Sequence, residues 1–322
     1  MTDVTTTADR PADVPQPAPL PPRTGRAGRE RRPLWLLIPG ASLLFLVVGV
    51  PFGLAVWMGF LDLDQYSLRD WISAPFIGVA NFAEAVGNSS MPHSLLISVE
   101  FAVLTTVFAA PIGFVAALTV SGRRTRGRGL VRSLYFVPYV IPQFVTGSLW
   151  RVLLLPGGPV DNLLHAVGID VKTQWLIGPT TFWTLVAVDV WASWAFIYLM
   201  SLAGLQTIPR ELYEAAEVDG VNWRQKIRHV VLPQLKGPLS LALLLSTLNH
   251  FNNFTLPFVL FGTPAPDAVN LLPINIYQTS FQVFRFGLGA AMSVLSLVIL
   301  AIPAVVYLRS VRLDAGPQEA DA

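Results

Sequence analysis

The stretch ELYEAAEVDGVNWRQKIRHVVLP, residues 211–233, lies between two of the most apolar segments of the chain. Acidic side chains occupy its first half and basic side chains its second. Gly220 suits the left-handed residue that follows a helix, because glycine has no Cβ to clash in that conformation. Asn222 and Gln225 have the spacing of a capping box that begins a second helix. The stretch therefore predicts two short helices joined by a turn.

The second of these helices is predicted over 223–230, and Pro233 is expected to end it before the membrane. Ala215 and Ala216 have almost no side chain, so another protein surface can approach the first helix closely. An ordinary amphipathic linker lying on the membrane is the alternative. The defined turn and the mixed charges favour a docking surface for a protein.

The rest of the composition is that of an integral membrane protein. Of the 322 residues, 53% are hydrophobic and 13% are charged, whereas a soluble domain carries about 25% charged residues. The absence of cysteine excludes disulfides and thiol chemistry. A helix needs roughly 20 apolar residues to cross a bilayer. Six runs meet this length, at about 33–60, 95–120, 133–155, 180–204, 238–262 and 287–308.

The basic residues predict how these spans are oriented. All but four of the 22 Lys and Arg residues lie in the two tails and in the loops 121–132 and 205–237. Cytoplasmic segments carry such an excess, so both termini and the charged stretch are predicted to be cytoplasmic. The predicted organisation is a disordered cytoplasmic tail over 1–32, a six-span domain over 33–309 with the charged loop at about 208–238, and a cytoplasmic tail over 310–322.

Several classes of site have no support in the sequence. None of the three lysines follows a glycine, so a phosphate-binding loop is absent and any ATP must be hydrolysed by a partner. Four scattered histidines without cysteine predict no metal site. No Gly-x-Ser-x-Gly elbow of a hydrolase occurs. The net charge of +2 gives no indication of nucleic-acid binding. The chain is therefore not expected to be an enzyme.

The fifth span carries a polar face. Ser246, Asn249, His250 and Asn253 follow each other at i, i+3, i+4 and i+7. Polar groups in hydrocarbon cost several kcal/mol each when unsatisfied, so this face should meet another helix or a watery cavity. Two interpretations remain open: hydrogen bonds that join helices, or contacts to the hydroxyl groups of a sugar.

Two acidic residues also fall within spans, Glu100 and Asp189. A charge near the bilayer centre costs about 2.5–3.5 kcal/mol, so each is expected to be paired within the bundle or to lie near the interface. In a carrier driven by protons they would instead form a relay with His250.

The charged stretch resembles the EAA coupling loop of the permease subunits of ABC importers. The matching residues are Glu214, Ala215, Ala216, Asp219, Gly220, Ile227, Leu232, Pro233 and Pro238. The resemblance implies an all-α, six-span permease fold in the plasma (inner) membrane, with Glu214, Ala215, Ala216, Asp219, Gly220, Leu232 and Pro233 contacting an ATPase. It also implies the partners: a second, similar membrane subunit, two ATPase subunits that bind ATP and Mg²⁺, and an extracytoplasmic solute-binding protein. No cofactor is expected in this chain.

Other segments are similar to the sugar-importing members of that family. They are 76–82, 138–162 and the run Asn252-Asn253-Phe254 in the fifth span. The likeness implies a path for a sugar or oligosaccharide, with Ser193 and Phe196 of the fourth span among its contacts. Ala195 and the segment 262–266 depart from the family pattern. The alternatives are a permease for another solute such as a glycerol phosphodiester, a proton-coupled carrier and a membrane scaffold.

Overall fold

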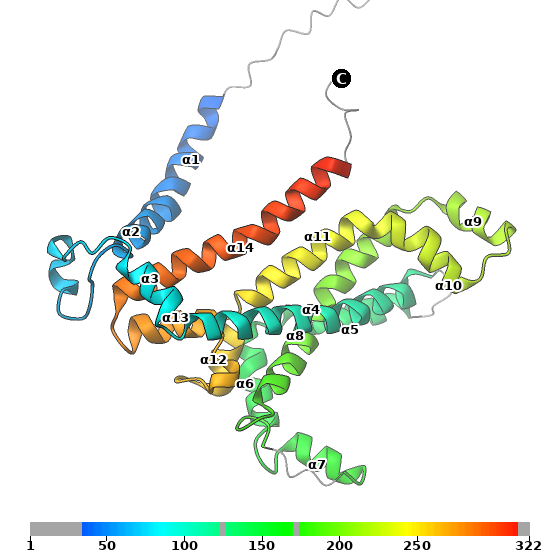
Figure 1. The fold of residues 1–322 in the computed structure, drawn as a ribbon. Coiled ribbons are helices and arrows are strands. Elements are labelled where there is room, and N and C mark those ends of the chain that lie inside the picture. The colour runs from blue at the N-terminus through cyan, green and yellow to red at the C-terminus, as the bar shows by residue number, and fades with distance from the viewer. Residues whose placement is uncertain (1–33, 123–126, 170–173, 315–322) are drawn as a thin grey trace, which may run out of the picture. The chain divides into compact units, whose positions relative to one another are not determined.

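The computed structural model describes residues 34–122, 127–169 and 174–314, and this part of the chain is almost wholly helical (Figure 1). The α-helices are, in chain order, α1 (Ile38–Leu44), α2 (Val50–Met58), α3 (Ala80–Gly87), α4 (Met91–Ser121), α5 (Arg128–Val140), α6 (Gln143–Leu153), α7 (Pro159–Ala166), α8 (Thr181–Thr207), α9 (Arg210–Val218), α10 (Trp223–Lys226), α11 (Leu232–Phe251), α12 (Thr255–Phe261), α13 (Leu272–Phe281) and α14 (Phe286–Asp314). Short 3-10 or π turns occupy Leu34–Leu37, Phe45–Gly49, Leu68–Ser73, Ile227–Val231 and Asp267–Val269. The all-α prediction is confirmed, since the described residues contain one isolated β-bridge and no strand.

The chain divides into two compact units, Met1–Val50 and Pro51–Ala322. In the described part of the first unit, α1 and the π turn Phe45–Gly49 bury no residue. The second unit contains the packed core. The tail predicted at 1–32 lies outside the described residues, as do residues 315–322 of the other tail.

Five helical stretches in the described residues are long and apolar enough to cross a membrane, not six. They are Ile38–Met58, Met91–Ser121, Thr181–Thr207, Trp223–Phe251 and Phe286–Ser310. The span predicted over 133–155 is the exception, because it consists of two shorter helices.

The break between α5 and α6 follows from Pro142. Proline has no N–H, and its ring keeps the preceding residue out of the helical region. Ile141 and Pro142 are accordingly extended, with ψ angles of 123° and 139°. The apolar run was long enough to predict a single span, but it could not show that proline divides it into two helices.

A second break separates α11 from α12 within the span predicted over 238–262. α11 ends at Phe251 and α12 begins at Thr255. Pro257 has no N–H, and its ring would clash with the carbonyl group four residues earlier, at Asn253, if the helix continued. The chain leaves the helical path one residue earlier, at Asn252, whose φ and ψ angles are −92° and 14°.

The core of the second unit lies between α4, α8 and α11. α4 and α8 approach closely at Gly113, where a Cβ atom would lie 2.6 Å from the carbonyl oxygen of Trp194. Such small residues allow close packing of membrane helices. Phe101, Leu185 and Tyr198 are almost completely buried in this core. The close contact fixes α8 against α4 and so positions the side chains that α8 contributes to the site.

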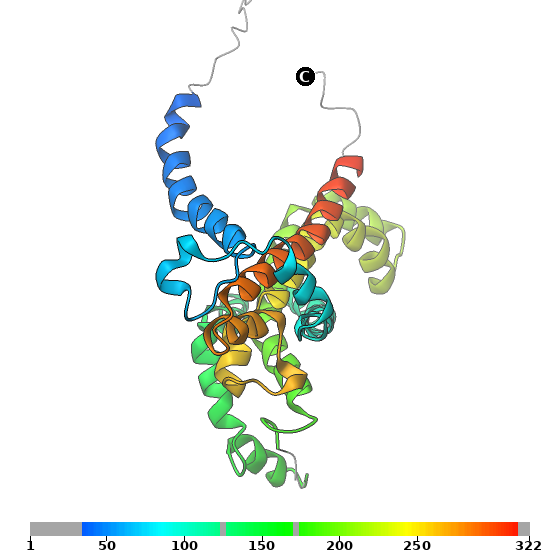
Figure 2. The ribbon, with the colours of Figure 1, turned by 60° about the vertical axis from the view of Figure 1, so that its left-hand side comes forward.

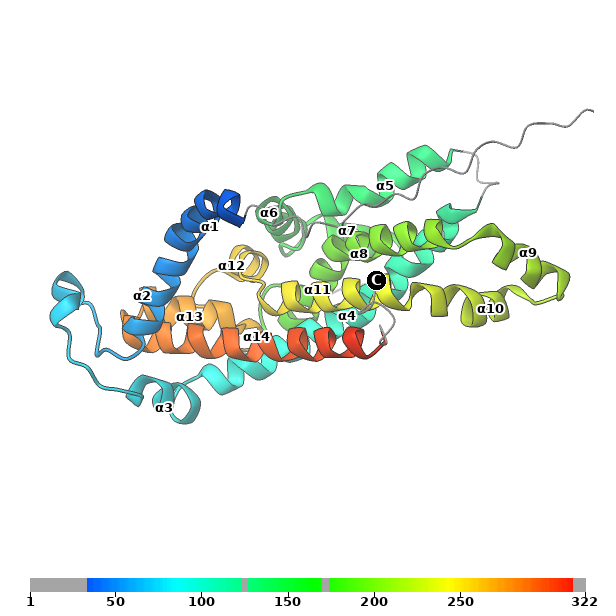
Figure 3. The same ribbon diagram turned by 90° about the horizontal axis from the view of Figure 1, so that it is seen from above.

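α8 also separates two parts of the second unit. α7 precedes α8 in the chain, and the pair α9–α10 follows it, so the two lie toward different ends of that helix (Figures 1 and 2). From above, α9 and α10 extend beyond the ends of α4 and α8 (Figure 3). The pair is therefore accessible to a partner.

Candidate functional site

A cavity of about 390 Å³ lies where the two helix breaks meet α8. Its lining residues come from α5–α6, from α8 and from α11–α12. They are Pro138, Tyr139, Ile141, Gln143, Asp189, Ala192, Ser193, Phe196, Ser246, Asn249, His250, Asn252, Asn253, Phe254 and Thr255. Broken helices at membrane depth are tolerated where they line a water-filled cavity, because water can then bind the free backbone groups. Both helix breaks meet this condition.

All six residues predicted to form a substrate path line this one cavity: Ser193, Phe196, Ser246, Asn249, His250 and Asn253. The cavity is also lined by Tyr139, Gln143 and Asp189, which were not predicted to belong to that path. Tyr139 stacks on Phe196 with ring centroids 5.9 Å apart, so the wall has an aromatic face as well as amides and hydroxyls.

Asp189 is the central polar group of the cavity wall and is 1% exposed. Its Oδ2 atom lies 2.7 Å from Nδ1 of His250, within ion-pair distance. Asn253 donates from Nδ2 to Oδ1 of Asp189 over 3.1 Å, and its own Oδ1 accepts from the N–H of Leu256 over 3.3 Å. The prediction that Asp189 is paired within the bundle is therefore confirmed. A buried carboxylate needs such partners, since an unpaired buried charge is strongly destabilising.

Glu100, the other acid predicted to be paired or interfacial, is exposed on α4. The neighbouring residue, Phe101, meets the ring of His250 edge-on at a centroid distance of 6.4 Å. Of the three residues proposed for a proton relay, the structure thus brings together Asp189 and His250.

Three buried polar atoms of cavity-lining residues have no hydrogen-bond partner among the described residues. They are Nε2 of His250, on α11, and Oγ of Ser193 and Oδ2 of Asp189, on α8. Among those residues, the Oδ2 atom of Asp189 has only its ion-pair contact to His250 Nδ1. Unpaired buried polar groups are rare in native structures and call for a physical explanation. No lysine or arginine is among the described residues of the lining. The cavity therefore presents neutral hydrogen-bonding groups and one paired carboxylate.

The second candidate site is the pair α9–α10, which we term the coupling hairpin (residues 210–226). Gly220 has a φ angle of +67°, as its predicted role at the helix end requires. The predicted capping box is present: the Asn222 side chain accepts from Gln225 N–H over 3.0 Å, and the Gln225 side chain accepts from Asn222 N–H over 3.1 Å. Lys226 Nζ joins the two arms by an ion pair to Glu217 over 2.9 Å. The predicted helix-turn-helix is confirmed.

One face of the coupling hairpin packs inward. Ala216 is 6% exposed and its carbonyl oxygen accepts from Val221 N–H over 3.1 Å. Tyr213 packs against the cluster that contains Val231, and burial raises the pKa of its hydroxyl above 10.0. Ala216 thus closes the turn and faces its own chain, whereas Glu214, Ala215, Asp219, Gly220, Leu232 and Pro233 are exposed. Contact between Ala216 and an ATPase therefore stays a prediction.

The expected end of the second helix at Pro233 is also wrong. α10 runs through a π turn at Ile227–Val231 into α11, and Leu232 N–H bonds to Ile227 O. Such a wider turn occurs as a local bulge within helices. Here it ends at Val231, two residues before Pro233, which has no N–H to donate. A single helical stretch of 29 residues, Trp223–Phe251, therefore connects the coupling hairpin to the cavity.

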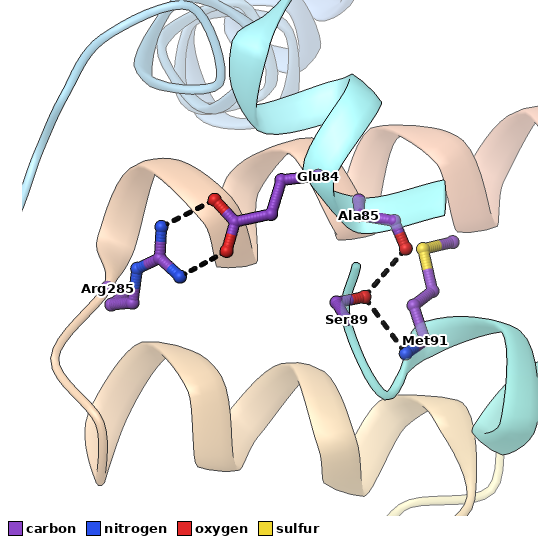
Figure 4. Close-up of polar contacts among 5 residues, drawn as sticks. All are labelled: Glu84, Ala85, Ser89, Met91 and Arg285. Carbon is purple, nitrogen blue, oxygen red and sulfur yellow. Dashed lines mark hydrogen bonds and ion pairs between the residues drawn. The ribbon is translucent and has the colours of Figure 1, made fainter. Parts of the chain in front are cut away.

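A third polar cluster joins α3 to the start of α14 (Figure 4). Glu84 and Arg285 form a two-pronged ion pair, with Oε2 and Nη2 2.7 Å apart. The hydrogen bonds from Arg285 hold the pKa of Glu84 below its ordinary value of 4.5. Asn81 donates from Nδ2 to the carbonyl oxygens of Gly59 and Leu61. In the turn between α3 and α4, Ser89 Oγ donates to Ala85 O and accepts from Met91 N–H.

Comparisons with known proteins agree with this architecture. The sequence model of a family described as "binding-protein-dependent transport system inner membrane component" matches residues 109–313. A trehalose/maltose transport system permease protein of Thermococcus litoralis is 30% identical over 279 residues, covering 85% of this chain and 91% of that protein. A trehalose transport permease of Mycobacterium tuberculosis is 30% identical, covering 89% of this chain and 91% of that protein.

Two further similarities widen the range of solutes among such proteins. An sn-glycerol-3-phosphate transport permease of Agrobacterium fabrum is 29% identical, covering 82% of this chain and 92% of that protein. Among solved structures, a chain of a bacterial ABC transporter that imports the acidic polysaccharide alginate has a TM-score of 0.73 at 21% identity, covering 86% of this chain and 96% of that chain. The family match over residues 109–313 includes the residues of the cavity and of the coupling hairpin.

Proposed function

The chain belongs to the family of binding-protein-dependent transport system inner membrane components, and from that premise we propose that its cavity carries a sugar or oligosaccharide. Members of the family are permease subunits, which cross the inner membrane and leave ATP hydrolysis to a separate subunit. This chain is accordingly a membrane subunit of an ABC importer and not an enzyme.

The observation that carries the choice of solute is the composition of the cavity wall. Amide and hydroxyl groups can both donate to and accept from sugar hydroxyls. They stand beside the stacked rings of Tyr139 and Phe196, which offer an apolar surface to the flat face of a sugar ring. The relatives that transport trehalose or maltose support the same class.

The coupling hairpin supports a mechanism for delivering energy to that cavity. Its exposed residues, led by Glu214 and Gly220, form the docking surface for the ATPase, which binds ATP and Mg²⁺. The helix Trp223–Phe251 begins in the hairpin and ends at the cavity with His250. At 1.5 Å per residue this helix is roughly 40 Å long. A displacement of the docked hairpin thereby moves one wall of the cavity without a flexible joint.

The full assembly in this proposal contains a second, similar permease subunit, two ATPase subunits and an extracytoplasmic solute-binding protein. Both termini and the coupling hairpin lie on the cytoplasmic side, in keeping with the distribution of basic residues. Substrate selection is then shared between the cavity and the binding protein.

The direct test is purification of the chain with the products of the neighbouring genes, followed by a screen of sugars for stimulated ATP hydrolysis in proteoliposomes. We expect a neutral sugar or oligosaccharide to stimulate hydrolysis and to accumulate inside the vesicles. Accumulation driven by a proton gradient without the ATPase would instead show a secondary carrier.

A phosphate-bearing solute is the second candidate, because one relative transports sn-glycerol-3-phosphate. Binding of a phosphate dianion favours arginine or lysine at the site, and none is among the described lining residues. The screen should therefore include glycerol 3-phosphate and a glycerol phosphodiester. Stimulation by these solutes and not by neutral sugars would overturn the choice of sugar.

A further inference from the structure

We infer that Asp189 is a positioning residue of the cavity: it orients His250 and Asn253, and thereby leaves His250 Nε2 as an acceptor for a hydroxyl group of the solute. This inference deepens the proposed function and rests on it for the nature of the solute. The sequence predicted either a structural pair or a place in a proton relay for Asp189. The contacts of the three side chains give it a more specific role.

The two oxygen atoms of Asp189 face different partners. One lies 2.7 Å from His250 Nδ1 and the other accepts from Asn253 Nδ2. Both partners are residues of α11 or of the break that follows it, whereas Asp189 comes from α8. Asp189 is thus the point at which α8 sets the orientation of the opposite wall of the cavity.

The contact with Asp189 decides which ring nitrogen of His250 carries the proton. A carboxylate next to Nδ1 places the proton on that nitrogen, since the partner of one ring nitrogen decides which tautomer is present. In neutral imidazole the other nitrogen, Nε2, is then an acceptor. Nε2 of His250 is buried and has no partner among the described residues. A hydroxyl group of a solute can donate to it.

The two polar ends of Asn253 are both occupied by the protein. Its Nδ2 donates to Asp189, and its Oδ1 accepts from the N–H of Leu256 in the first turn of α12. Asn253 therefore joins α8, α11 and α12, and its share in binding is to hold Asp189 and the helix break in place. Ser193, whose Oγ is also buried without a partner, completes a pair of free groups on facing helices.

The chemical class follows from these free groups. A solute that donates one hydroxyl to His250 Nε2 and exchanges a second hydrogen bond with Ser193 has at least two hydroxyl groups and no need of charge. A negatively charged group would instead approach the buried carboxylate of Asp189 and be repelled at short range. An uncharged polyhydroxylated solute fits both conditions.

The test uses the complete complex in proteoliposomes and separates KM from the maximal rate of sugar-stimulated uptake. In Asp189→Asn, the new amide can accept from His250 but then turns its NH₂ toward the NH₂ of Asn253. We expect KM to rise about tenfold from the loss of one charged hydrogen bond, with the maximal rate within about twofold.

A compensating variant distinguishes positioning from simple packing. In Asp189→Asn combined with Asn253→Asp, the amide at 189 donates to the carboxylate at 253, which still accepts from Leu256 N–H. This pair should restore KM to within about threefold of the original, because each donor again faces an acceptor. Failure of the double variant to recover, or a fall in the maximal rate with KM unchanged in the single variant, would overturn the inference.

Thr247→Val is the matched control, since Thr247 lies beside Ser246 on α11 but bonds to Thr106 of α4, outside the cavity. It removes a partly buried hydroxyl contact between helices of the same bundle. We expect its KM to be unchanged.

A second measurement does not depend on any sugar. In the complex labelled with ¹⁵N-histidine, the difference between the wild type and His250→Gln identifies His250 among the four histidines. We expect its spectrum to show a protonated Nδ1 and an unprotonated Nε2. A proton on Nε2 would overturn the inference, even in a complex that imports sugars. Conversely, the expected tautomer in a complex that no sugar stimulates would overturn the proposed function and leave the role of Asp189 supported.

Discussion

The coupling hairpin and the cavity are held together in opposite ways. In the hairpin the polar contacts join residues close in sequence: Asn222 and Gln225 are three residues apart, and Glu217 and Lys226 nine. In the cavity, Asp189 and Asn253 are 64 residues apart and both are at least 96% buried. The hairpin is shaped by local backbone preferences, and the cavity by the pairing of buried groups from separate helices.

The two regions should therefore respond differently to substitution. Exposed side chains of the hairpin can change without loss of folding, because water replaces their contacts. A change of backbone conformation there alters the docking surface itself. In the cavity, replacing one side chain of a buried pair leaves its partner buried and unpaired. The cost then appears in the stability of the complex as well as in transport.

The largest expected effect is that of Gly220→Pro, which tests the hairpin at its turn. Gly220 has a φ angle of +67°, whereas proline is fixed near −65°, and the mismatch costs about 3 kcal/mol or more. A change of that size corresponds to roughly a hundredfold loss of ATPase docking. Uptake and co-purification of the ATPase measure this loss of docking. We expect the variant chain still to insert into the membrane.

Gly237→Ala is the matched control for Gly220. Gly237 lies within α11, has no atom within 4 Å of an added Cβ and does not have a positive φ angle. Alanine favours the helix there. Uptake should remain at the level of the wild type. Normal uptake by Gly220→Pro would instead refute the role of the hairpin in coupling.

Asn253→Leu is the corresponding test of the cavity. The substitution removes the amide that donates to Asp189 and caps Leu256 N–H. We expect a loss of about 2 kcal/mol in stability of the complex, together with reduced uptake and retained assembly. Thermal unfolding of the purified complex and the yield of assembled subunits measure the two parts.

Asn249→Ala sharpens that result. Asn249 lines the cavity from the same helix but is exposed, so its loss leaves no buried partner unpaired. We expect altered KM with unchanged unfolding temperature. If both asparagine variants changed stability equally, the contrast between buried junction and free cavity wall would be wrong.

The same contrast explains what the sequence could predict. Gly220, Asn222 and Gln225 follow local conformational rules, so the turn and its capping box could be read from a few neighbouring residues. The polar face of α11 could be predicted from helical spacing, as could the need for Asp189 to be paired. The partners of Asp189 could not be predicted in this way, because they depend on how α8 packs beside α11.

Continuity of helices was the weakest part of the prediction. Pro142 and Pro257 break their spans, whereas Pro233 does not end its helix because a π turn precedes it. A proline shows where a hydrogen bond is missing. Whether the chain then bends, breaks or widens depends on what packs around it, which is a property of the tertiary structure.

A smaller effect is expected for Asn222→Ala, which removes one side of the capping box but keeps the turn at Gly220. Loss of an N-cap costs about 1 kcal/mol, so we expect uptake to fall by about fivefold. Faster hydrogen exchange of the α10 amides should accompany it. Asn222→Ser retains a capping oxygen and should restore both, whereas an uptake defect in the serine variant would show that the amide itself contacts the partner.

The smallest effect concerns Glu84 and Arg285, which pair over 201 residues but are 32% and 43% exposed. This pair tests whether burial or distance in the sequence makes the contacts of the cavity sensitive to substitution. Because the pKa of Glu84 is lowered in the folded chain, its stabilisation is present above pH 4.5 and is lost as the pH falls through the lowered value. For a solvent-screened pair the contribution is below about 1 kcal/mol.

Glu84→Gln should therefore lower the unfolding temperature slightly near pH 7 and differ less from the wild type as the pH falls toward 3. Asp64 and Asp161, whose pKa values are also lowered by hydrogen bonds, titrate in both proteins and cancel in the difference. A loss as large as that of Asn253→Leu would mean that long-range pairing alone makes a contact critical. A small loss that disappears in acid would show that burial is what makes the Asp189 junction sensitive.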